Sequence, residues 1–294
     1  MQADDMSAVA LAGDRHVLGE GPTYDPDTDT AYWFDIVGKK LIEHSFADNR
    51  QRTHDLPFMA SVLASVDDKR QLLAAEDGLY LRDRESGRLT LHIALEADNH
   101  TTRSNDGRVH PSGALWIGTM GKRAEKKAGA IYWYRDGEIR LLFPEIGIPN
   151  AICFSPDGRI GYFADTQIDT IFRAELDPET GLPLGAPQVF LKPGHDAGAP
   201  DGAVVDRYGA LWCARWGGHC ISAYDPHGRH LASLPVPASQ PSCPAFVGRD
   251  ADRLIVTSAM QGLDAKALQG EPGAGRTFLL DHPVEGQHAP RVRL

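Results

Sequence analysis

The chain has 294 residues, and its 40 acidic and 30 basic side chains give a formal net charge of −10. This balance disfavours nucleic acid as a partner, because phosphate binding depends on clustered Lys and Arg. The one basic run, Lys122–Arg123 with Lys126–Lys127, is expected to be a solvated loop. A chain of this length is long enough to bury a large core.

The N-terminal segment at residues 1–13 contains two aspartates and no basic region, so it is a poor match to a signal peptide. No apolar segment is long enough to cross a bilayer, and we expect no membrane partner. The four cysteines lack the paired spacing of a zinc site and are expected to be reduced core residues: Cys153, Cys213, Cys220 and Cys243. These features predict a cytoplasmic protein.

One pattern recurs along the whole chain: a short apolar run, an acidic or glycine-bearing turn, and a second apolar run. The copies are Gly21–Asp35, Ser61–Ala75, Asp106–Met120, Ala151–Asp165, Gly202–Trp216 and Pro244–Ser258. They start roughly 40–50 residues apart, a period typical of propeller blades. Val, Ile, Leu and aromatic residues dominate the runs, which predicts β-hairpins.

A second hairpin is expected behind the first in each repeat, as in Thr170–Lys192, which turns at Asp177–Gly181. Two hairpins per repeat predict an all-β protein, a six-bladed β-propeller with four-stranded antiparallel blades, spanning residues 1–294 as a single domain. Residues 1–7 are expected to be disordered. Ala8–Val17 is expected to supply a strand to the last blade, around Thr277–Leu280, and to close the ring. Gly262–Gln269 is the one stretch with a helical signal.

Oxygen-bearing side chains stand where the repeats begin. We interpret Glu20, Asn150 and Asp201 as occupying one equivalent position in the first, fourth and fifth repeats. In a propeller this position lies at one mouth of the central channel. Two carboxylates and an amide oxygen suit a hard cation such as Ca²⁺, Mg²⁺ or Mn²⁺. Each residue alone is also a common turn residue, so recurrence is what favours a metal site.

Four motifs in order carry a resemblance to a known family. The motifs are LGEGPTYD, RSNDGRVHPSGALWIGTM, IPNAICFSPDGRIGYFADT and PDGAVVDRYGALWCARWGG. With them the chain resembles a bacterial-type member of the senescence marker protein/regucalcin/gluconolactonase family of sugar lactonases. The match runs from about Leu18 to about Gly275. The resemblance implies a six-bladed propeller with one divalent metal ion at the channel mouth, with Ca, Zn, Mn, Mg and Fe all left open.

The resemblance also implies roles for individual residues. The family's metal ligands fall on Glu20, Asn150 and Asp201, and its sugar-contacting residues on Arg103 and Asn105. Regucalcin-like members have a sugar-contacting glutamate where this chain has Arg123, and Glu125 lies two residues further on. Arg123 is therefore a candidate substrate contact of opposite charge, one that would favour a lactone bearing a carboxylate.

These residues predict metal-dependent hydrolysis of an aldono- or aldarolactone by an activated water, with Asp201 as the catalytic base. The substrate is then a small-molecule sugar lactone, and the chain is expected to be a monomer or a weak homo-oligomer. A non-catalytic calcium-binding or regulatory propeller would use the same ligands and remains open. An arylesterase of the paraoxonase kind would require a histidine pair, and none is evident. WD and kelch interaction propellers would show signature dipeptides, which are absent.

Overall fold

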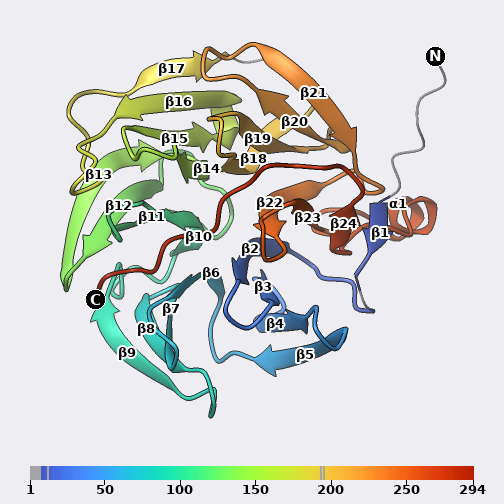
Figure 1. The fold of residues 1–294 in the computed structure, drawn as a ribbon, viewed down its shortest axis with the longest axis horizontal. Helices are drawn as coiled ribbons and strands as arrows, with labels where there is room; N and C mark the ends of the chain where they lie inside the picture. The colour runs from blue at the N-terminus through green and yellow to red at the C-terminus, as the bar shows by residue number, and fades with distance from the viewer. Residues whose placement is uncertain (1–7, 12, 193, 195) are drawn as a thin grey trace.

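The computed structural model describes residues 8–11, 13–192, 194 and 196–294. The described strands form six four-stranded antiparallel sheets, arranged as the blades of a ring (Figure 1). The inner strands contact one another in a closed order, β2–β6–β10–β14–β18–β22–β2. The predicted six-bladed β-propeller is therefore confirmed. The expected disorder of residues 1–7 lies outside the described residues.

The blades follow one another along the chain. Blade 1 contains β2 (Gly19–Asp25), β3 (Thr30–Asp35), β4 (Lys40–Ser45) and β5 (Arg50–Asp55). Blade 2 contains β6 (Ala60–Ser65), β7 (Arg70–Ala75), β8 (Gly78–Asp83) and β9 (Leu89–Ala94). Blade 3 contains β10 (Thr102–Val109), β11 (Leu115–Gly121), β12 (Gly129–Arg135) and β13 (Glu138–Ile146).

The other three blades complete the ring. Blade 4 contains β14 (Pro149–Phe154), β15 (Ile160–Asp165), β16 (Thr170–Glu175) and β17 (Gln188–Leu191), with the short 3₁₀ helix η1 (Thr166–Ile168) after β15. Blade 5 contains β18 (Ala199–Val205), β19 (Leu211–Trp216), β20 (Cys220–Tyr224) and β21 (His230–Pro235). Blade 6 contains β22 (Pro241–Val247), β23 (Arg253–Ser258), β24 (Phe278–Leu280) and β1 (Ala8–Ala10), and α1 (Ala265–Gly270) precedes β24.

The ring closes through both ends of the chain. β1 is the outer strand of blade 6 and pairs antiparallel with β24, from Ala8 opposite Leu280 to Ala10 opposite Phe278. The N-terminal segment therefore supplies the strand that the sequence predicts for it. The predicted helix is also present, and it begins after Asp264, whose side chain accepts a hydrogen bond from the Ala267 N–H at 2.8 Å.

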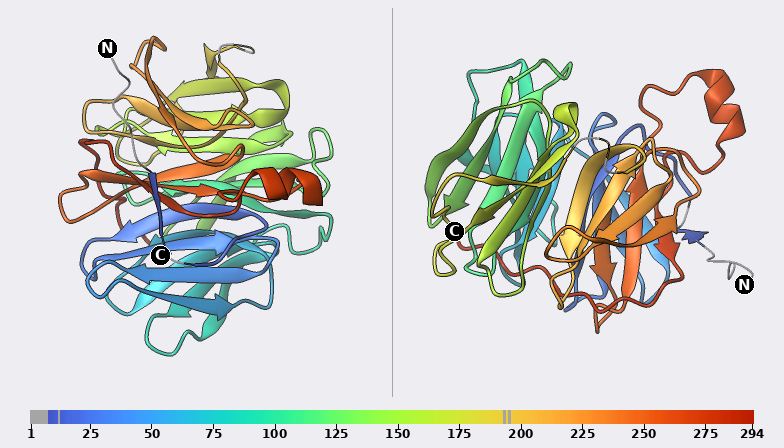
Figure 2. Two further views of the ribbon diagram at one scale, coloured as in Figure 1. Left: turned by 90° about the vertical axis from the view of Figure 1, so that its right-hand side faces the viewer. Right: turned by 90° about the horizontal axis from the view of Figure 1, so that it is seen from above.

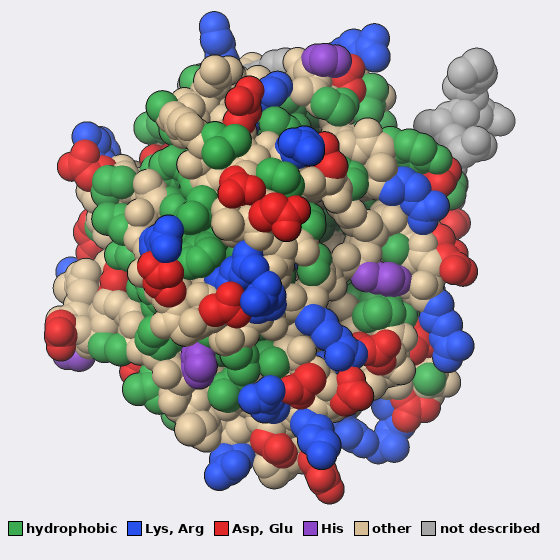
Figure 3. Space-filling view, turned by 60° about the vertical axis from the view of Figure 1, so that its left-hand side comes forward, with side chains coloured by type: hydrophobic (Ala, Val, Ile, Leu, Met, Phe, Trp, Pro, Cys, Tyr) green, Lys and Arg blue, Asp and Glu red, His purple; other side chains and the backbone are tan. Residues whose placement is uncertain are grey.

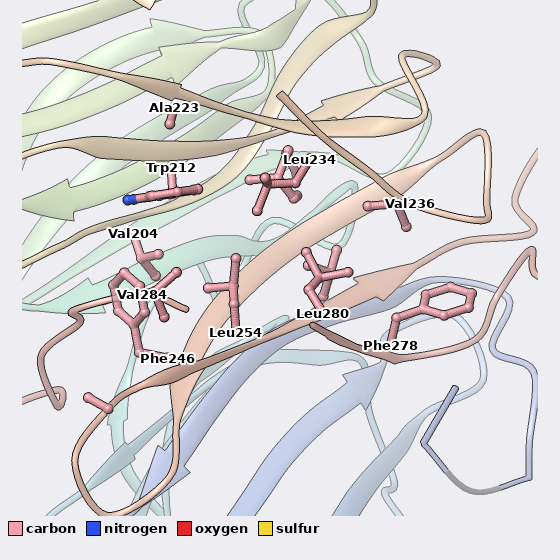
Figure 4. Close-up of a cluster of buried hydrophobic side chains, with 14 of the residues drawn as sticks. Val204, Trp212, Ala223, Leu234, Val236, Phe246, Leu254, Phe278, Leu280 and Val284 are labelled. Carbon is pink, nitrogen blue, oxygen red and sulfur yellow. The ribbon is translucent and has the colours of Figure 1, made fainter. Parts of the chain in front are cut away.

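The core lies mainly between neighbouring blades. Figure 4 shows the cluster between blades 5 and 6, where Trp212 and Leu234 face Phe246 and Leu254. Burying one such side chain fully contributes about 1.5–3 kcal/mol to folding. All four cysteines are free thiols, as the sequence predicts. Cys153, Cys213 and Cys243 are core residues, whereas Cys220 is only partly buried, so the core prediction is wrong for Cys220.

The C-terminal segment, residues 281–294, crosses one mouth of the channel, on the face opposite α1 (Figures 1 and 2). Its backbone donates from Val292 N to Ser65 O at 2.8 Å and from Arg293 N to Gly113 O at 2.9 Å. The cavity beneath it, lined by Arg108 and His288 among others, has a volume of only about 80 Å³. A cavity of this volume is too small for a molecule the size of a sugar.

On the face in Figure 3, basic and acidic side chains are interspersed rather than gathered into a patch of one sign. No helix in the described part of the chain combines the length and the apolar character needed to cross a membrane.

Candidate functional site

A cavity of about 360 Å³ lies at the mouth where the inner strands begin. This volume suits a small polar molecule. The cavity brings together all six side chains that the sequence singles out: Glu20, Arg103, Asn105, Arg123, Asn150 and Asp201. Its lining also includes Lys122 of the basic run, together with residues to which the sequence assigned no role: Leu18, Met120, Ala124, Ile148, Thr166, Trp216 and Gln261.

Four inner strands, β2, β10, β14 and β18, line the cavity, and each of them contains a β-bulge. Glu20 pairs with Phe34 and Asn150 with Ala164, each directly before the bulge of its strand. Asp201 lies one residue later, inside the bulge between Pro200 and Ala203. The interpretation that all three residues share one repeat position is therefore wrong for Asp201. By strand register its equivalent is Asn105, which lies in the bulge after Ser104.

Two kinds of bulge explain why Asp201 lies one register position later than Glu20 and Asn150. In blades 1 and 4 the residue after the ligand candidate is left-handed, with φ of 56° at Gly21 and 50° at Ala151. No residue of the blade 5 bulge has a positive φ. Bulges of different type re-aim neighbouring side chains by different amounts. Side chains from two successive register positions therefore converge on the same cavity.

The buried carboxyl groups of Glu20 and Asp201 line the cavity, and the buried carboxyl group of Asp106 lies close enough to act on both. Burial raises the pKa of Glu20 to about 8, and the charge of Asp106 adds to that effect. Burial also raises the pKa of Asp201 well above its ordinary value, with further contributions from Glu20 and Asp106. These side chains repel one another, so the site favours a positively charged group between them.

Asp106 is a member of this cluster that the sequence analysis missed. Its carboxylate accepts hydrogen bonds from Gly107 N at 2.8 Å and from Ile152 N at 2.7 Å. It therefore ties the bulge of blade 3 to the bulge of blade 4. The available signal was its place beside Asn105 in the RSNDG motif, where the resemblance implies sugar contacts by Arg103 and Asn105.

Arg103 and Asn105 lie next to the carboxylates. Arg103 Nη1 donates to the Asn105 Oδ1 at 2.7 Å and to the Ser104 carbonyl at 2.8 Å. Burial lowers the pKa of Arg103 to about 10, so the guanidinium stays charged at neutral pH. Asn105 Nδ2 donates to Asn150 Oδ1 at 2.8 Å. The three side chains are thus held in one orientation.

The sequence profile described as "SMP-30/Gluconolactonase/LRE-like region" matches residues 18–260, most of the ring. The chain belongs to this family. The resemblance that the four motifs indicate is therefore confirmed.

Relatives of this SMP-30/gluconolactonase family member cover nearly its whole length. A protein of Rhizobium meliloti (strain 1021), whose name proposes a sugar lactone lactonase, is 50% identical over 277 residues and 94% of each chain. The L-arabinolactonase of Azospirillum brasilense is 36% identical over 92% of this chain and 91% of its own. The crystal structure of regucalcin, a calcium-binding protein from Agrobacterium tumefaciens, is 49% identical, covers 98% of both chains and has a TM-score of 0.97.

The loop after β11 carries three charged residues near the cavity, Lys122, Arg123 and Glu125. Lys122 lies at the cavity but is engaged elsewhere, since its Nζ pairs with the Glu76 carboxylate at 2.5 Å and donates to the His100 carbonyl at 3.0 Å. Glu125 folds back and accepts from Arg123 N at 3.1 Å. Of the two alternatives that the sequence leaves open, Arg123 lines the cavity and Glu125 does not.

The donor set at the cavity fits a hard divalent cation. No group of three or more His, Cys, Asp or Glu side chains in the described ranges is arranged to hold a metal ion. A site here therefore needs the Asn150 amide oxygen beside the carboxylates of Glu20 and Asp201. All three donors are oxygens, which Ca²⁺, Mg²⁺ and Mn²⁺ prefer. A cation among them would offset the repulsion that raises the pKa values of both carboxyl groups.

Proposed function

We propose that this protein hydrolyses a sugar lactone to the open-chain sugar acid, and that Glu20, Asn150 and Asp201 hold a divalent metal ion for this reaction. The observation that supports the proposal best is the open cavity of about 360 Å³, where two buried carboxylates, an amide oxygen and an arginine meet. Membership in the family, and relatives named as lactonases, support the same reaction.

A lactone is a cyclic ester, so its hydrolysis needs an activated water and stabilisation of the charge that develops on the carbonyl oxygen. A bound divalent cation supplies both, because it polarises the carbonyl and lowers the pKa of water. Asp201 is the proposed base: it takes a proton from the attacking water and later returns it to the ring oxygen that leaves. Burial raises the pKa of Asp201, and a bound cation would favour the charged carboxylate that accepts the proton.

Arg103 and Asn105 would hold the sugar. Arg103 uses one nitrogen, Nη1, for its contacts with Ser104 and Asn105. Arg103 lines the cavity, and its remaining donors would be available to sugar hydroxyls there. The side chain is 6% exposed, so it is already ordered before a substrate binds.

The test measures the hydrolysis of a panel of aldono- and aldarolactones in the presence of a divalent cation. The readout is the proton that is released when each lactone opens to its acid. We expect turnover of at least one sugar lactone well above its spontaneous opening. The second candidate function, a non-catalytic calcium-binding propeller, is favoured by the likeness to the calcium-binding regucalcin structure. Calcium binding without turnover of any lactone in the panel would support that candidate and contradict the lactonase.

Arg123 would set the preference among lactones. We expect the wild-type protein to turn over galactarolactone, which bears a carboxylate, faster than a neutral aldonolactone. Arg123 is exposed, and its interaction with a carboxylate is partly screened by water, so Arg123→Glu should shift the ratio of the two kcat/KM values by about three- to tenfold.

Lys126→Glu is the matched control for Arg123. It makes the same charge change in the same exposed loop but lies outside the cavity lining. We expect its substrate ratio to equal that of the wild type. A strong preference of the wild-type protein for the neutral lactone would contradict this role of Arg123.

A further inference from the structure

Thr166 connects two of the proposed metal ligands, although no motif assigns it a role. It begins η1, directly after β15, and lies at the cavity. Asn150 Nδ2 donates to Thr166 Oγ1 at 2.9 Å, and Thr166 Oγ1 donates to the Pro200 carbonyl at 2.7 Å. Its hydroxyl therefore joins the side chain of Asn150 in blade 4 to the residue before Asp201 in blade 5.

The donor and the acceptor in each of these hydrogen bonds follow from two groups at the ends of the series: the Pro200 carbonyl, which can only accept, and Arg103, which can only donate. The Pro200 carbonyl can only accept, so it takes the single proton of the Thr166 hydroxyl. The hydroxyl oxygen must then accept from Asn150, which places the NH₂ group of that amide toward Thr166.

The hydrogen bonds on the Arg103 side give the same orientation of the Asn150 amide. Arg103 can only donate, so the Asn105 atom that it contacts is the amide oxygen, and Asn105 Nδ2 points the other way. That NH₂ group donates to the Pro149 carbonyl at 3.0 Å and to Asn150 Oδ1 at 2.8 Å. Both ends therefore leave the Asn150 oxygen on the side away from Thr166.

The position of Thr166 does not depend on its own hydroxyl. The preceding residue, Asp165, accepts from Gly147 N at 3.0 Å, from Ile148 N at 3.1 Å and from Gln167 N at 3.1 Å. These bonds tie the end of β15 to the backbone just before β14 and to the backbone of η1. The hydroxyl of Thr166 can thus be removed without releasing the segment that carries it.

We propose that Thr166 is a positioning residue that presents the Asn150 oxygen to the metal ion and couples it to the backbone that carries Asp201. This inference rests on the proposed function, because it assigns a purpose to the orientation of a proposed ligand. A residue that orients a metal ligand from behind changes metal affinity about 10- to 100-fold when it is removed.

The test compares Thr166→Val, which keeps the shape and removes the hydroxyl, with Thr166→Ser, which keeps the hydroxyl. Titration calorimetry with Ca²⁺ and separately with Mn²⁺ measures affinity directly. We expect Thr166→Val to bind about tenfold or more weakly, and Thr166→Ser to bind within about threefold of the wild type. Thr166→Ala also lacks the hydroxyl, is expected to match Thr166→Val, and replaces it if that variant does not fold.

Thr170→Val is the control for a general loss of stability. Its hydroxyl donates to the Ile168 carbonyl at 2.9 Å in the same segment and has no contact with Asn150. We expect its metal affinity to be that of the wild type. Wild-type affinity in Thr166→Val, or equal losses in the Val and Ser variants, would overturn the proposal.

The metal titration separates this proposal from the proposed function. If the wild-type protein binds metal and hydrolyses no lactone, the proposed function fails, while the comparison of the Thr166 variants still decides the positioning role. Where the wild type is active, kcat/KM at a limiting metal concentration should fall in Thr166→Val and be restored in Thr166→Ser.

Discussion

Asp201→Asn is expected to lower kcat/KM for lactone hydrolysis by about 10³-fold or more. Loss of a general base alone typically costs 10²–10⁴-fold. The substitution also removes one of the two carboxylates proposed to hold the metal ion. We therefore expect the steady-state assay with excess divalent cation to show turnover at or near the level of spontaneous ring opening.

The variant should remain folded, which makes the loss interpretable. Asp201 is fully buried and receives a hydrogen bond from its neighbour Gly202, and its burial disfavours the charged form. An amide of the same shape removes that unfavourable charge, so the melting temperature of the metal-free protein should not fall. Asp250→Asn, an identical change at an exposed position, should keep wild-type activity. Retained activity in Asp201→Asn would contradict the mechanism.

The architecture could be predicted because it is repeated. Six copies of one hairpin pattern predict six blades, and Ala8–Val17 predicts the closing strand because it has no hairpin partner of its own. The structure confirms both, down to the pairing of β1 with β24. The hairpin pattern is weak in any single copy, but its repetition makes the prediction of blades secure. Each blade must bury the same two faces of its sheet against the neighbouring blades, so the same pattern returns in every copy.

The candidate site could be predicted only in part. Glu20 and Asn150 follow from the repeat, but Asp201 lies one register position later. The sequence shows the spacing of the strands, whereas the aim of a side chain depends on the φ angle of the residue inside each bulge. Asp106 and Thr166 were missed for a related reason: both act through backbone groups of another blade, which leave no pattern in the local sequence.

Removal of divalent metal is expected to abolish turnover, and its return is expected to restore it. After chelation and buffer exchange, two buried carboxylates face each other with Arg103 as the positive charge acting on both. A bound divalent cation would offset their repulsion more directly, because it would lie between them. Assays across added Ca²⁺, Mn²⁺, Mg²⁺ and Zn²⁺, with metal content checked by elemental analysis, would rank the ions.

The thermal stability of the protein provides a second measure of metal binding. A ligand at 100 times its dissociation constant stabilises the folded state by about 2.7 kcal/mol, so the melting temperature should rise with metal concentration. Glu20→Gln removes one proposed ligand and should weaken both responses. Full turnover in protein shown to be free of metal would contradict the mechanism.

The pH dependence of metal binding has a definite sign. Burial and the charge of Asp106 raise the pKa of Glu20 to about 8, so at neutral pH a proton competes with the metal ion for this carboxylate. Metal affinity should therefore rise with pH up to about 8 and level off above it, with proton release on binding. The Glu20→Gln variant should lose this part of the pH dependence. If the wild type and Glu20→Gln show the same pH profile, Glu20 does not bind the metal ion.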